Sequence, residues 1–588
     1  MSAQGRAAAP NGKGTRVGTL FSALDIGRGG LQVAQVQLDT AGHNIASVNK
    51  EGFSRQRVEL LTRDPNVKTY GAIGRGVYVS GIARLRDRFL DVAYRQENSS
   101  LGNAQQQAIY FQRLEDIFDE PGDTGLSTRL NQFFDSLQDF AGNVDDVPTR
   151  VATLEEAQAL AGVFNDVDRR LRILRTNAND QIKDAVKEIN SLADRIAELN
   201  DTILGLELSG NTANDLRDDR DLLLDELSGL ANISFNERDN GVVDVLFGGE
   251  QLVTGNRVNE LETVANPALD PNRNDLVEVR YVASGSVITP RDGELAGLFQ
   301  IRDVELAGVE NRADDLAREL IRNMNSLQAS GRGLAPYSGA ITTSNPVSGN
   351  TTPFNSAGLP FPVNNGSFDI QVYDNAGNLV ETVSVGILAS VAPPLQTTLS
   401  VLQFQIDLSP NLNTTLNPDG TLTISPIAGR TFTFANDTSG ALTALGLNTF
   451  FNGSEAGSIR VNQTLVDQPE LVSSGSDPDL TVTGDNSIAL QMAQLRDANI
   501  LDGGTQNFNQ FYETTLVEVG INSRANEQLL AVQENAAQDF DFRRQEVSGV
   551  SIDEEITQLI QFQRAFEASA RVITVADNLL GTLIDLVR

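Results

Sequence analysis

The sequence contains no cysteine, and its only histidine is His43. Without cysteine there can be no disulfide, no thiol nucleophile and no cysteine-ligated metal. A Ser-His-Asp triad or a multi-histidine metal site would have to depend on His43 alone. His43 lies within a predicted helix, where we expect a packing or surface side chain rather than a base. We therefore expect no catalytic residue, no metal and no cofactor.

Long apolar runs are also missing. No segment approaches the roughly 20 apolar residues that a membrane-spanning helix needs. Residues 1–18 are small, polar and weakly basic, and they lack the apolar centre of a secretory signal peptide. We expect them to form a flexible N-terminal extension. We also expect any export of the chain to proceed without a cleavable signal peptide.

Positive charge is scarce, with 45 basic residues against 78 acidic ones and a net charge of -33. Nucleic-acid and anionic-lipid partners need clustered Lys and Arg, so the charge balance argues against both. We interpret the acidity as a contribution to solubility. Hydrophobic residues make up 40% of the 588 residues, which indicates a globular chain of roughly three to five domains.

Heptad patterns occupy both ends of the chain. Near the N-terminus, apolar or small residues recur at alternating spacings of four and three from Leu20 to Val48. Near the C-terminus, Ser551 and Glu554 form a capping box, and a second seam covers residues 552–587. Two polar residues, Gln563 and Asp577, occupy positions of that second seam.

Neither end helix can bury its apolar stripe alone, because helices in water owe most of their stability to packing. The simplest expectation is that the two helices pack on each other and on neighbouring subunits. An ordinary helix pair within one chain remains the alternative.

The middle of the sequence changes character several times. Helical patterns cover about 85–230, period-two patterns with a hairpin signal at Asp239-Asn240-Gly241 cover about 232–290, and helix returns at 295–328. Residues 336–484 are dense in Gly, Ser, Thr, Asn and Pro, with short alternating runs that are typical of a β-rich domain.

These patterns predict an elongated multidomain α+β chain. It would have paired N- and C-terminal helices, a helical rod domain with a small β-sheet, and an inserted β-rich outer domain. The predicted domains are the extension 1–18, a terminal helical axial domain from 19–65 with 546–588, a helical rod domain from 66–335 with 485–545, and the outer domain 336–484.

Several motifs carry a family resemblance. The stretch from Gly42 to Asn49, followed by Gly52-Phe53-Ser54-Arg55-Gln56, resembles the N-terminal signature of flagellar axial proteins, the family of rod, hook and hook-associated proteins. Lys50, Glu51 and Phe53 are mild departures from that signature. We expect Arg55 and Gln56 to be exposed polar contacts. Residues 74–90, 214–221, 293–303 and 551–565 are similar to later elements of the family, so the resemblance covers roughly 17–335 and 484–588.

The resemblance implies a structural subunit of the bacterial flagellum that self-assembles into a ring between hook and filament. Its partners would be copies of itself, the hook protein, a second junction protein, an export chaperone and the type III export apparatus. The protein would lie outside the cell, with no nucleic-acid or membrane partner. The expected assembly interface consists of seam residues and the turn after the first helix: Leu24, Leu31, Leu38, Ile45, Asn49, Gly52, Phe53, Ser54, Arg55, Gln56, Ile556, Leu559, Phe566, Ile573, Leu580 and Ile584.

Other interpretations are weaker. Another axial role, as hook, rod, second junction protein or flagellin, stays open, although chain length and the Ser54-Arg55-Gln56 ending favour the first junction position. The glycines between 71 and 76 lack the spacing and lysine of a phosphate loop. The acidic residues of 215–221 alternate with arginines and are interpreted as a solvated, paired face rather than a Ca²⁺ loop. A hydrolase carried in 336–484 is the least favoured alternative.

Overall fold

The computed structural model describes residues 17–68, 71–118, 125–210, 212–271, 273–390 and 395–587. Residues 1–16 of the predicted extension lie outside this part, whereas Val17 and Gly18 begin the first helix. The chain divides into two compact units, one formed by Met1–Gln107, Asn179–Phe299 and Asn526–Arg588, and the other by Ala108–Ala178 and Gln300–Ala525. Within the described residues, no helix combines the length and the apolar character needed to cross a membrane.

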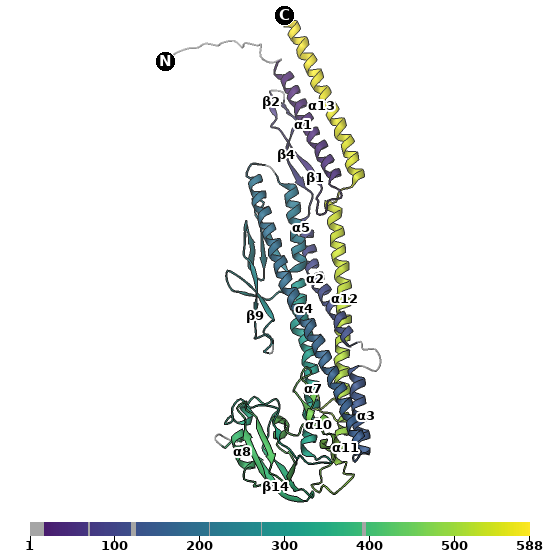
Figure 1. Cartoon of the computed structure of the whole chain (residues 1–588). Coiled ribbons are helices and arrows are strands. Elements are labelled where there is room, and N and C mark those ends of the chain that lie inside the picture. The colour runs from purple at the N-terminus through teal and green to yellow at the C-terminus, as the bar shows by residue number, and fades with distance from the viewer. Residues whose placement is uncertain are drawn as a thin grey trace, which may run out of the picture. The chain divides into compact units, whose positions relative to one another are not determined.

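The first unit holds both ends of the chain as a helix pair. Helix α1 (Val17–Ala46) packs along helix α13 (Ile552–Val587), as the sequence predicts (Figure 1). The two backbones approach closely at two glycines of α1. A Cβ atom on Gly27 would lie 2.9 Å from Ile573 Cγ1, and one on Gly30 would lie 2.8 Å from Ser569 Oγ. The small residues of the α1 seam therefore set how closely the helices pack.

A β-ribbon lies against α1. Its strands are β1 (Gln56–Thr62) and β4 (Val77–Arg84), which pair antiparallel, and β2 (Asn66–Lys68) and β3 (Gly71–Ile73), which pair with each other. Gly76 and Val77 lie against α1 around Ile26 and Gly29. The pattern analysis did not identify this ribbon.

The rest of the first unit combines long helices with two small sheets. Its helical segments come from α2 (Arg88–Phe118), α4 (Val147–Glu207), α5 (Asn214–Leu230), α6 (Glu294–Gln300) and α12 (Phe508–Ser548). One sheet has the order β5-β6-β7-β8 (Ile233–Glu237, Val243–Phe247, Glu250–Thr254, Arg257–Val258). The other has the order β11-β10-β9 (Val287–Ile288, Val277–Tyr281, Leu261–Ala265).

The predicted hairpin in this region is confirmed. Strands β5 and β6 pair antiparallel from Ile233↔Phe247 to Glu237↔Val243, and Gly241 between them has φ = 80°, a conformation that glycine adopts at little cost.

The second unit packs helices against the strands of the glycine- and threonine-rich region. Its helices include α3 (Leu126–Gly142), α7 (Leu306–Ser330), α8 (Leu399–Ile406), α9 (Ala441–Leu445), α10 (Gln463–Asp467) and α11 (Ser487–Gln494). A three-stranded sheet has the order β14-β13-β17 (Leu379–Ile387, Gly366–Asp374, Arg430–Ala435). A second has the order β12-β16-β15 (Ile341–Thr342, Leu422–Pro426, Leu412–Leu416), and β18 (Phe451–Asn452) pairs with β19 (Arg460–Val461).

One buried apolar core joins these helices and strands, with Phe133, Leu320, Phe432 and Phe450 fully buried within it. The architecture confirms an α+β multidomain chain with paired terminal helices. A π-helical turn, Ile301–Glu305, lies between α6 and α7 and was not predicted, since the apolar period continues through it.

Candidate assembly site at the base of the terminal helices

The turn after α1 leads the chain across the surface of α5. Gly52 has φ = +74°, as expected of a glycine at a helix exit, and a Cβ atom there would lie 3.3 Å from Leu222 Cβ on α5. Phe53 is half-buried, and its ring lies edge-on to the ring of His43, with centroids 5.4 Å apart. The turn is thus held close to α5 before the ribbon begins.

Ser54 is bound to α5 through Asp218. Its backbone N–H and its hydroxyl donate to the two oxygens of this carboxylate at 2.9 and 2.7 Å. Arg84, at the end of β4, donates to Asp218 at 2.8 Å. Asp218 is only 1% exposed, and desolvation raises its pKa although Arg84 and Ser54 oppose the rise. This buried carboxylate joins the turn, the ribbon and α5.

A second carboxylate of α5, Asp221, binds several guanidinium groups. Arg84 and Arg86 donate to Asp221 at 2.8 and 3.0 Å, and Arg95 of α2 lies 3.4 Å from it. Burial opposes ionisation of Asp221, but the charges of Arg86, Arg95 and Arg84 outweigh it and lower the pKa. The charge cluster continues to Asp225, which pairs with Arg95 and with Arg544 of α12.

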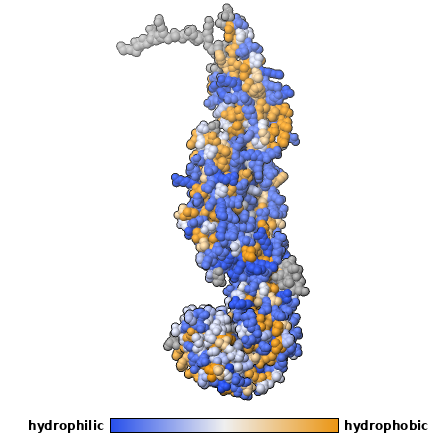
Figure 2. All heavy atoms as spheres, in the orientation of Figure 1, coloured by the Kyte–Doolittle hydropathy of each residue, from blue (hydrophilic) through white to orange (hydrophobic). Residues whose placement is uncertain are grey.

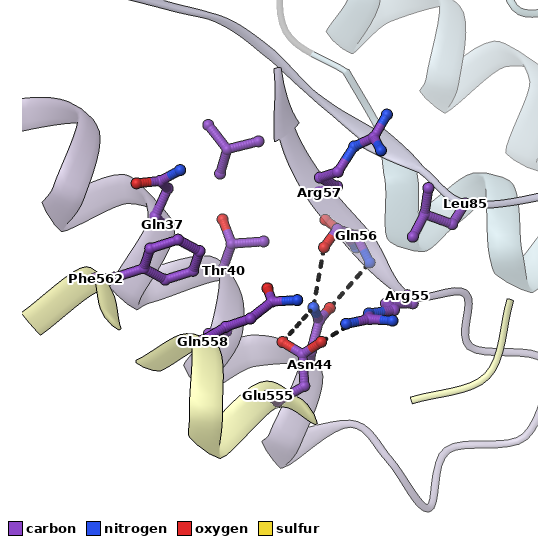
Figure 3. Close-up of a pocket in the computed structure, with 12 residues that line it drawn as sticks. Gln37, Thr40, Asn44, Arg55, Gln56, Arg57, Leu85, Glu555, Gln558 and Phe562 are labelled. Carbon is purple, nitrogen blue, oxygen red and sulfur yellow. Dashed lines mark hydrogen bonds and ion pairs between the residues drawn. The ribbon is translucent and has the colours of Figure 1, made fainter. Parts of the chain in front are cut away.

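The C-terminal helix enters the site through Glu555. Asn44 Nδ2 of α1 donates to Glu555 Oε2 and to the Gln56 carbonyl, both at 3.0 Å, while the Gln56 N–H donates to Asn44 Oδ1 at 3.0 Å (Figure 3). Arg55 Nε donates to Glu555 Oε1 at 2.7 Å, and Arg55 Nη1 donates to Glu554 at 2.8 Å. Glu555 is 1% exposed, so its charge is compensated entirely within this cluster.

Gln56 extends the same network to the first turn of α5. Its amide donates to Asp215 Oδ1 at 2.7 Å and accepts from Asn214 at 3.2 Å. His43 Nε2 lies 3.2 Å from the same Asp215 oxygen. We call the set Asn44, Ser54, Arg55, Gln56, Asp215, Asp218 and Glu555 the terminal joint, because it fixes both end helices to α5 and to the ribbon.

A small polar cavity of about 210 Å³ opens beside the joint. Gln37 and Thr40 of α1, Gln558 and Phe562 of α13, and Leu85 after β4 contribute to its lining, and Figure 3 shows these side chains around it. Within the described residues, no cluster of His, Cys, Asp and Glu has an arrangement that could hold a metal ion.

The structure brings together only part of the predicted interface. Eight of the predicted seam residues are half-buried between or beside α1 and α13: Leu24, Leu31, Leu38, Ile45, Leu559, Phe566, Ile573 and Leu580. Ile556 and Ile584 are instead 46% and 64% exposed. Asn49 and Gly52 are exposed at the turn. The side chains of Leu20 and Val587, the outermost seam positions, lie outside those described.

Three expectations about polar residues are wrong. Arg55 and Gln56 were expected to be exposed contacts, but Gln56 is buried and the Arg55 side chain is mostly covered, because carboxylates from α5 and α13 reach them. The α5 acids were expected to face solvent, whereas Asp218 is buried. Gln563 and Asp577 were expected in the seam, yet both are exposed, and Phe562 and Ala576 face inward instead.

Asn44 and Glu555 were not predicted as site residues. Each is a polar residue within an amphipathic helix, and nothing local in either helix distinguishes it from a solvated side chain. A usable signal is the spacing of Asp218, Asp221 and Asp225, which places three carboxylates on one face of α5. The arginines at 84, 86 and 95 are their counterparts.

Two family models match parts of the chain. Residues 111–340 match the family model described as "Flagellar hook-associated protein FlgK helical domain". Residues 543–586, which include most of α13, match the model described as "Flagellar basal body rod FlgEFG protein C-terminal".

Curated relatives match nearly the whole chain. Flagellar hook-associated protein 1 of Bacillus subtilis is 27% identical over 96% of this chain and 98% of its own length. The proteins of the same name from Salmonella typhimurium and Escherichia coli are 27% and 26% identical, over 96% of this chain and 100% of their own. The solved FlgK structure from Burkholderia pseudomallei aligns with 77% of this chain and 100% of its own, with 18% identity and a TM-score of 0.49.

The two family models and the curated relatives define the class: the chain is a structural junction protein of the bacterial flagellum. Within that class, the chain is similar over nearly its whole length to the proteins named flagellar hook-associated protein 1, and over residues 111–340 to the FlgK helical domain.

Proposed function

We propose that the chain assembles through α1, α13 and the terminal joint into a ring between the hook and the filament. The observation that carries the proposal is the apolar surface that α13 leaves exposed beside α1. Hydrophobic residues gather at the base of α13 in Figure 2. The exposed apolar side chains of this helix are Ile552, Ile556, Ile560, Val572, Val575, Leu579 and Ile584.

Burial of an aliphatic side chain contributes about 1.5–3 kcal/mol. While the exposed side of α13 stays in water, this free energy is not gained at any of these positions. Neighbouring copies supply the missing apolar surface, so assembly stabilises the helix pair. The mechanism is packing between subunits and not catalysis.

The partners follow from the family and from the resemblance of the terminal motifs. In this proposal the ring contacts the hook protein on one side and a second junction protein on the other. The chain reaches this place outside the cell through the flagellar type III export apparatus, with a cytoplasmic chaperone holding it beforehand.

Deletion of residues 549–588 tests the role of α13. We expect circular dichroism to show that the second unit still folds, because its core contains no residue of α13. We expect the truncated chain to be monomeric and to give non-motile cells when it replaces the native chain. Normal motility with a normal hook–filament junction would refute the proposal.

A point-variant version separates assembly from folding. Ile556→Asp with Val575→Asp changes two exposed positions of α13, and Leu408→Asp changes an exposed position in the second unit as a matched control. We expect all three substitutions to leave the Tm of the monomer nearly unchanged. Assembly should fail only in the α13 variant, and equal behaviour of the two variants would contradict the proposal.

A further inference from the structure

The β1–β4 ribbon presents several apolar side chains to solvent. Leu61 and Tyr78 lie directly opposite each other in the two strands, and they are 52% and 40% exposed. Leu60 is also exposed. Apolar side chains that are this exposed gain free energy when another surface covers them. The ribbon is therefore an unpartnered apolar surface within the first unit.

The same ribbon is basic in a strongly acidic chain. Residues 57–75 contain four basic and two acidic residues, whereas the whole chain contains 45 and 78. Arg57 and Arg75 are exposed and Arg63 is half-buried. In the described part of the chain, none of these three guanidinium groups forms an ion pair. Figure 3 draws no hydrogen bond or ion pair from Arg57 to the other residues shown.

A surface of matching character lies where α12 ends and α13 begins. Val547, Ile552, Ile556 and Ile560 are exposed there. Residues 545–563 contain four acidic residues and no basic one. Glu555 is buried within the terminal joint, but Glu546 and Asp553 are exposed. This region, which we call the acidic shoulder, combines apolar area with negative charge, as the ribbon combines apolar area with positive charge.

We infer that the ribbon of one copy docks on the acidic shoulder of a second copy. The inference rests on the proposed function and names the surfaces that form one of its contacts. Complementary charge would orient the encounter and fix its register, while the apolar side chains would supply the buried area. Both surfaces are exposed in the same chain, so neither covers the other within one copy.

The geometry favours a head-to-tail contact. The ribbon and the acidic shoulder are different surfaces of one copy, and the ribbon and α13 both pack on α1 (Figure 1). The contact therefore joins two different surfaces, one from each copy. The copy that supplies the ribbon keeps an uncovered shoulder, and the copy that supplies the shoulder keeps an uncovered ribbon. Such a heterologous contact propagates from copy to copy and closes into a ring when the rotation permits.

Cross-linking tests this contact, because the native chain has no cysteine. Cells would co-express full-length chains with Leu61→Cys and with Ile556→Cys, and assembled flagella would be oxidised and analysed by electrophoresis. We expect a covalent dimer of the two chains. Leu61→Cys paired with Leu408→Cys, an exposed position in the second unit, is the control and should give no dimer.

A charge swap gives an independent readout. Arg63→Glu should lower the cross-linking yield about tenfold at low salt, since a like charge would then face the acidic shoulder. Glu546→Arg in the partner chain should restore the yield, because it reverses the opposing charge near the C-terminal end of α12, where a basic residue also suits the helix dipole. Arg257→Glu, at another exposed arginine of the first unit, should change nothing.

The outcomes separate this inference from the proposed function. If the cysteine chains form normal filaments but no Leu61–Ile556 cross-link appears, the docking contact is refuted and the ring stands. If Leu61 cross-links mainly to Leu61, the contact is symmetric and the inference is also refuted. If the native chain itself does not reach the hook–filament junction, the proposed function fails first.

Discussion

Asn44 and Glu555 are separated by 511 positions in the sequence, yet the Asn44 amide donates to the Glu555 carboxylate at 3.0 Å. Both side chains are buried. A single hydrogen bond therefore links the last turn of α1 to the first turn of α13. Apolar seams alone permit two helices to slide by a turn, and a buried polar pair fixes one register.

Asn44→Asp should destabilise this register. The substitution replaces a donor by a second carboxylate beside Glu555, and we expect the free energy of unfolding of the first unit to fall by about 1–3 kcal/mol at pH 7. Urea denaturation followed by circular dichroism measures the change. Asn49→Asp makes the same change at an exposed position and should stay within about 0.5 kcal/mol of the native chain. Equal losses at the two positions would contradict the role of Asn44.

Arg55→Ala should cost more than the loss of an ordinary surface arginine. Arg55 binds Glu555 at 2.7 Å, and its removal leaves that buried carboxylate without its cation, which costs about 3–5 kcal/mol when burial is complete. The matched control is Arg564→Ala on α13, whose exposed pair with Glu567 contributes about 0–1 kcal/mol. The urea midpoints of the two variants measure this difference, and we expect the lower midpoint for Arg55→Ala. Similar midpoints would show that Glu555 is solvated.

Gly27→Val should separate the terminal helices. A Cβ atom there already meets Ile573 Cγ1 at 2.9 Å, so α1 and α13 must move apart or change rotamers. Gly42→Val, also within α1, meets nothing within 4 Å and serves as the control. We expect a lower Tm and impaired motility for the first variant only. A normal junction with Gly27→Val would mean that the close approach at Gly27 is dispensable.

Asp314→Asn should stabilise the second unit above pH 6. Burial raises the pKa of Asp314 to about 6, with the nearby charges of Glu455 and Asp168 acting in the same direction. The folded state therefore binds this proton more tightly than the unfolded state, and its stability falls as pH rises from about 4 through 6. Asparagine keeps an oxygen for the Ala456 N–H, which donates to Asp314 at 2.9 Å, and carries no charge.

Urea midpoints measured between pH 4 and pH 8 give the readout for Asp314→Asn. The difference between the urea midpoint of the variant and that of the native chain should grow from about pH 4 and level off above pH 6. Asp315→Asn, at an exposed neighbour paired with Arg318, is the control and should show no such rise. A pH-independent difference for Asp314→Asn would show that Asp314 ionises normally in the fold.

The regular parts of this fold were predictable, because repeated apolar spacing is a local property. The heptad seams gave α1 and α13, and the Asp239-Asn240-Gly241 turn gave the β5–β6 hairpin. The short alternating runs predicted within 336–484 likewise include strand β13 (Gly366–Asp374). In each case the physical cause lies within a dozen residues of the sequence.

The terminal joint was only partly predictable. The turn residues from Gly52 to Gln56 were found through a resemblance, but their burial was not, because it depends on carboxylates more than 150 positions away. Asp218 looks like a solvated acid until Arg84 and Ser54 are placed beside it. Local composition cannot show whether a charged side chain meets water or a distant partner.

The terminal joint depends on residues from near both ends of the chain. Asn44 and Arg55 belong to the first tenth of the sequence, and the carboxylate they share is supplied only within the last 40 residues. A chain that ends early leaves these two groups facing water and cannot set the register of its first helix. The joint thereby forms only in chains that extend at least to Glu555, and truncation before that residue removes the hydrogen bonds that tie α1 to α13.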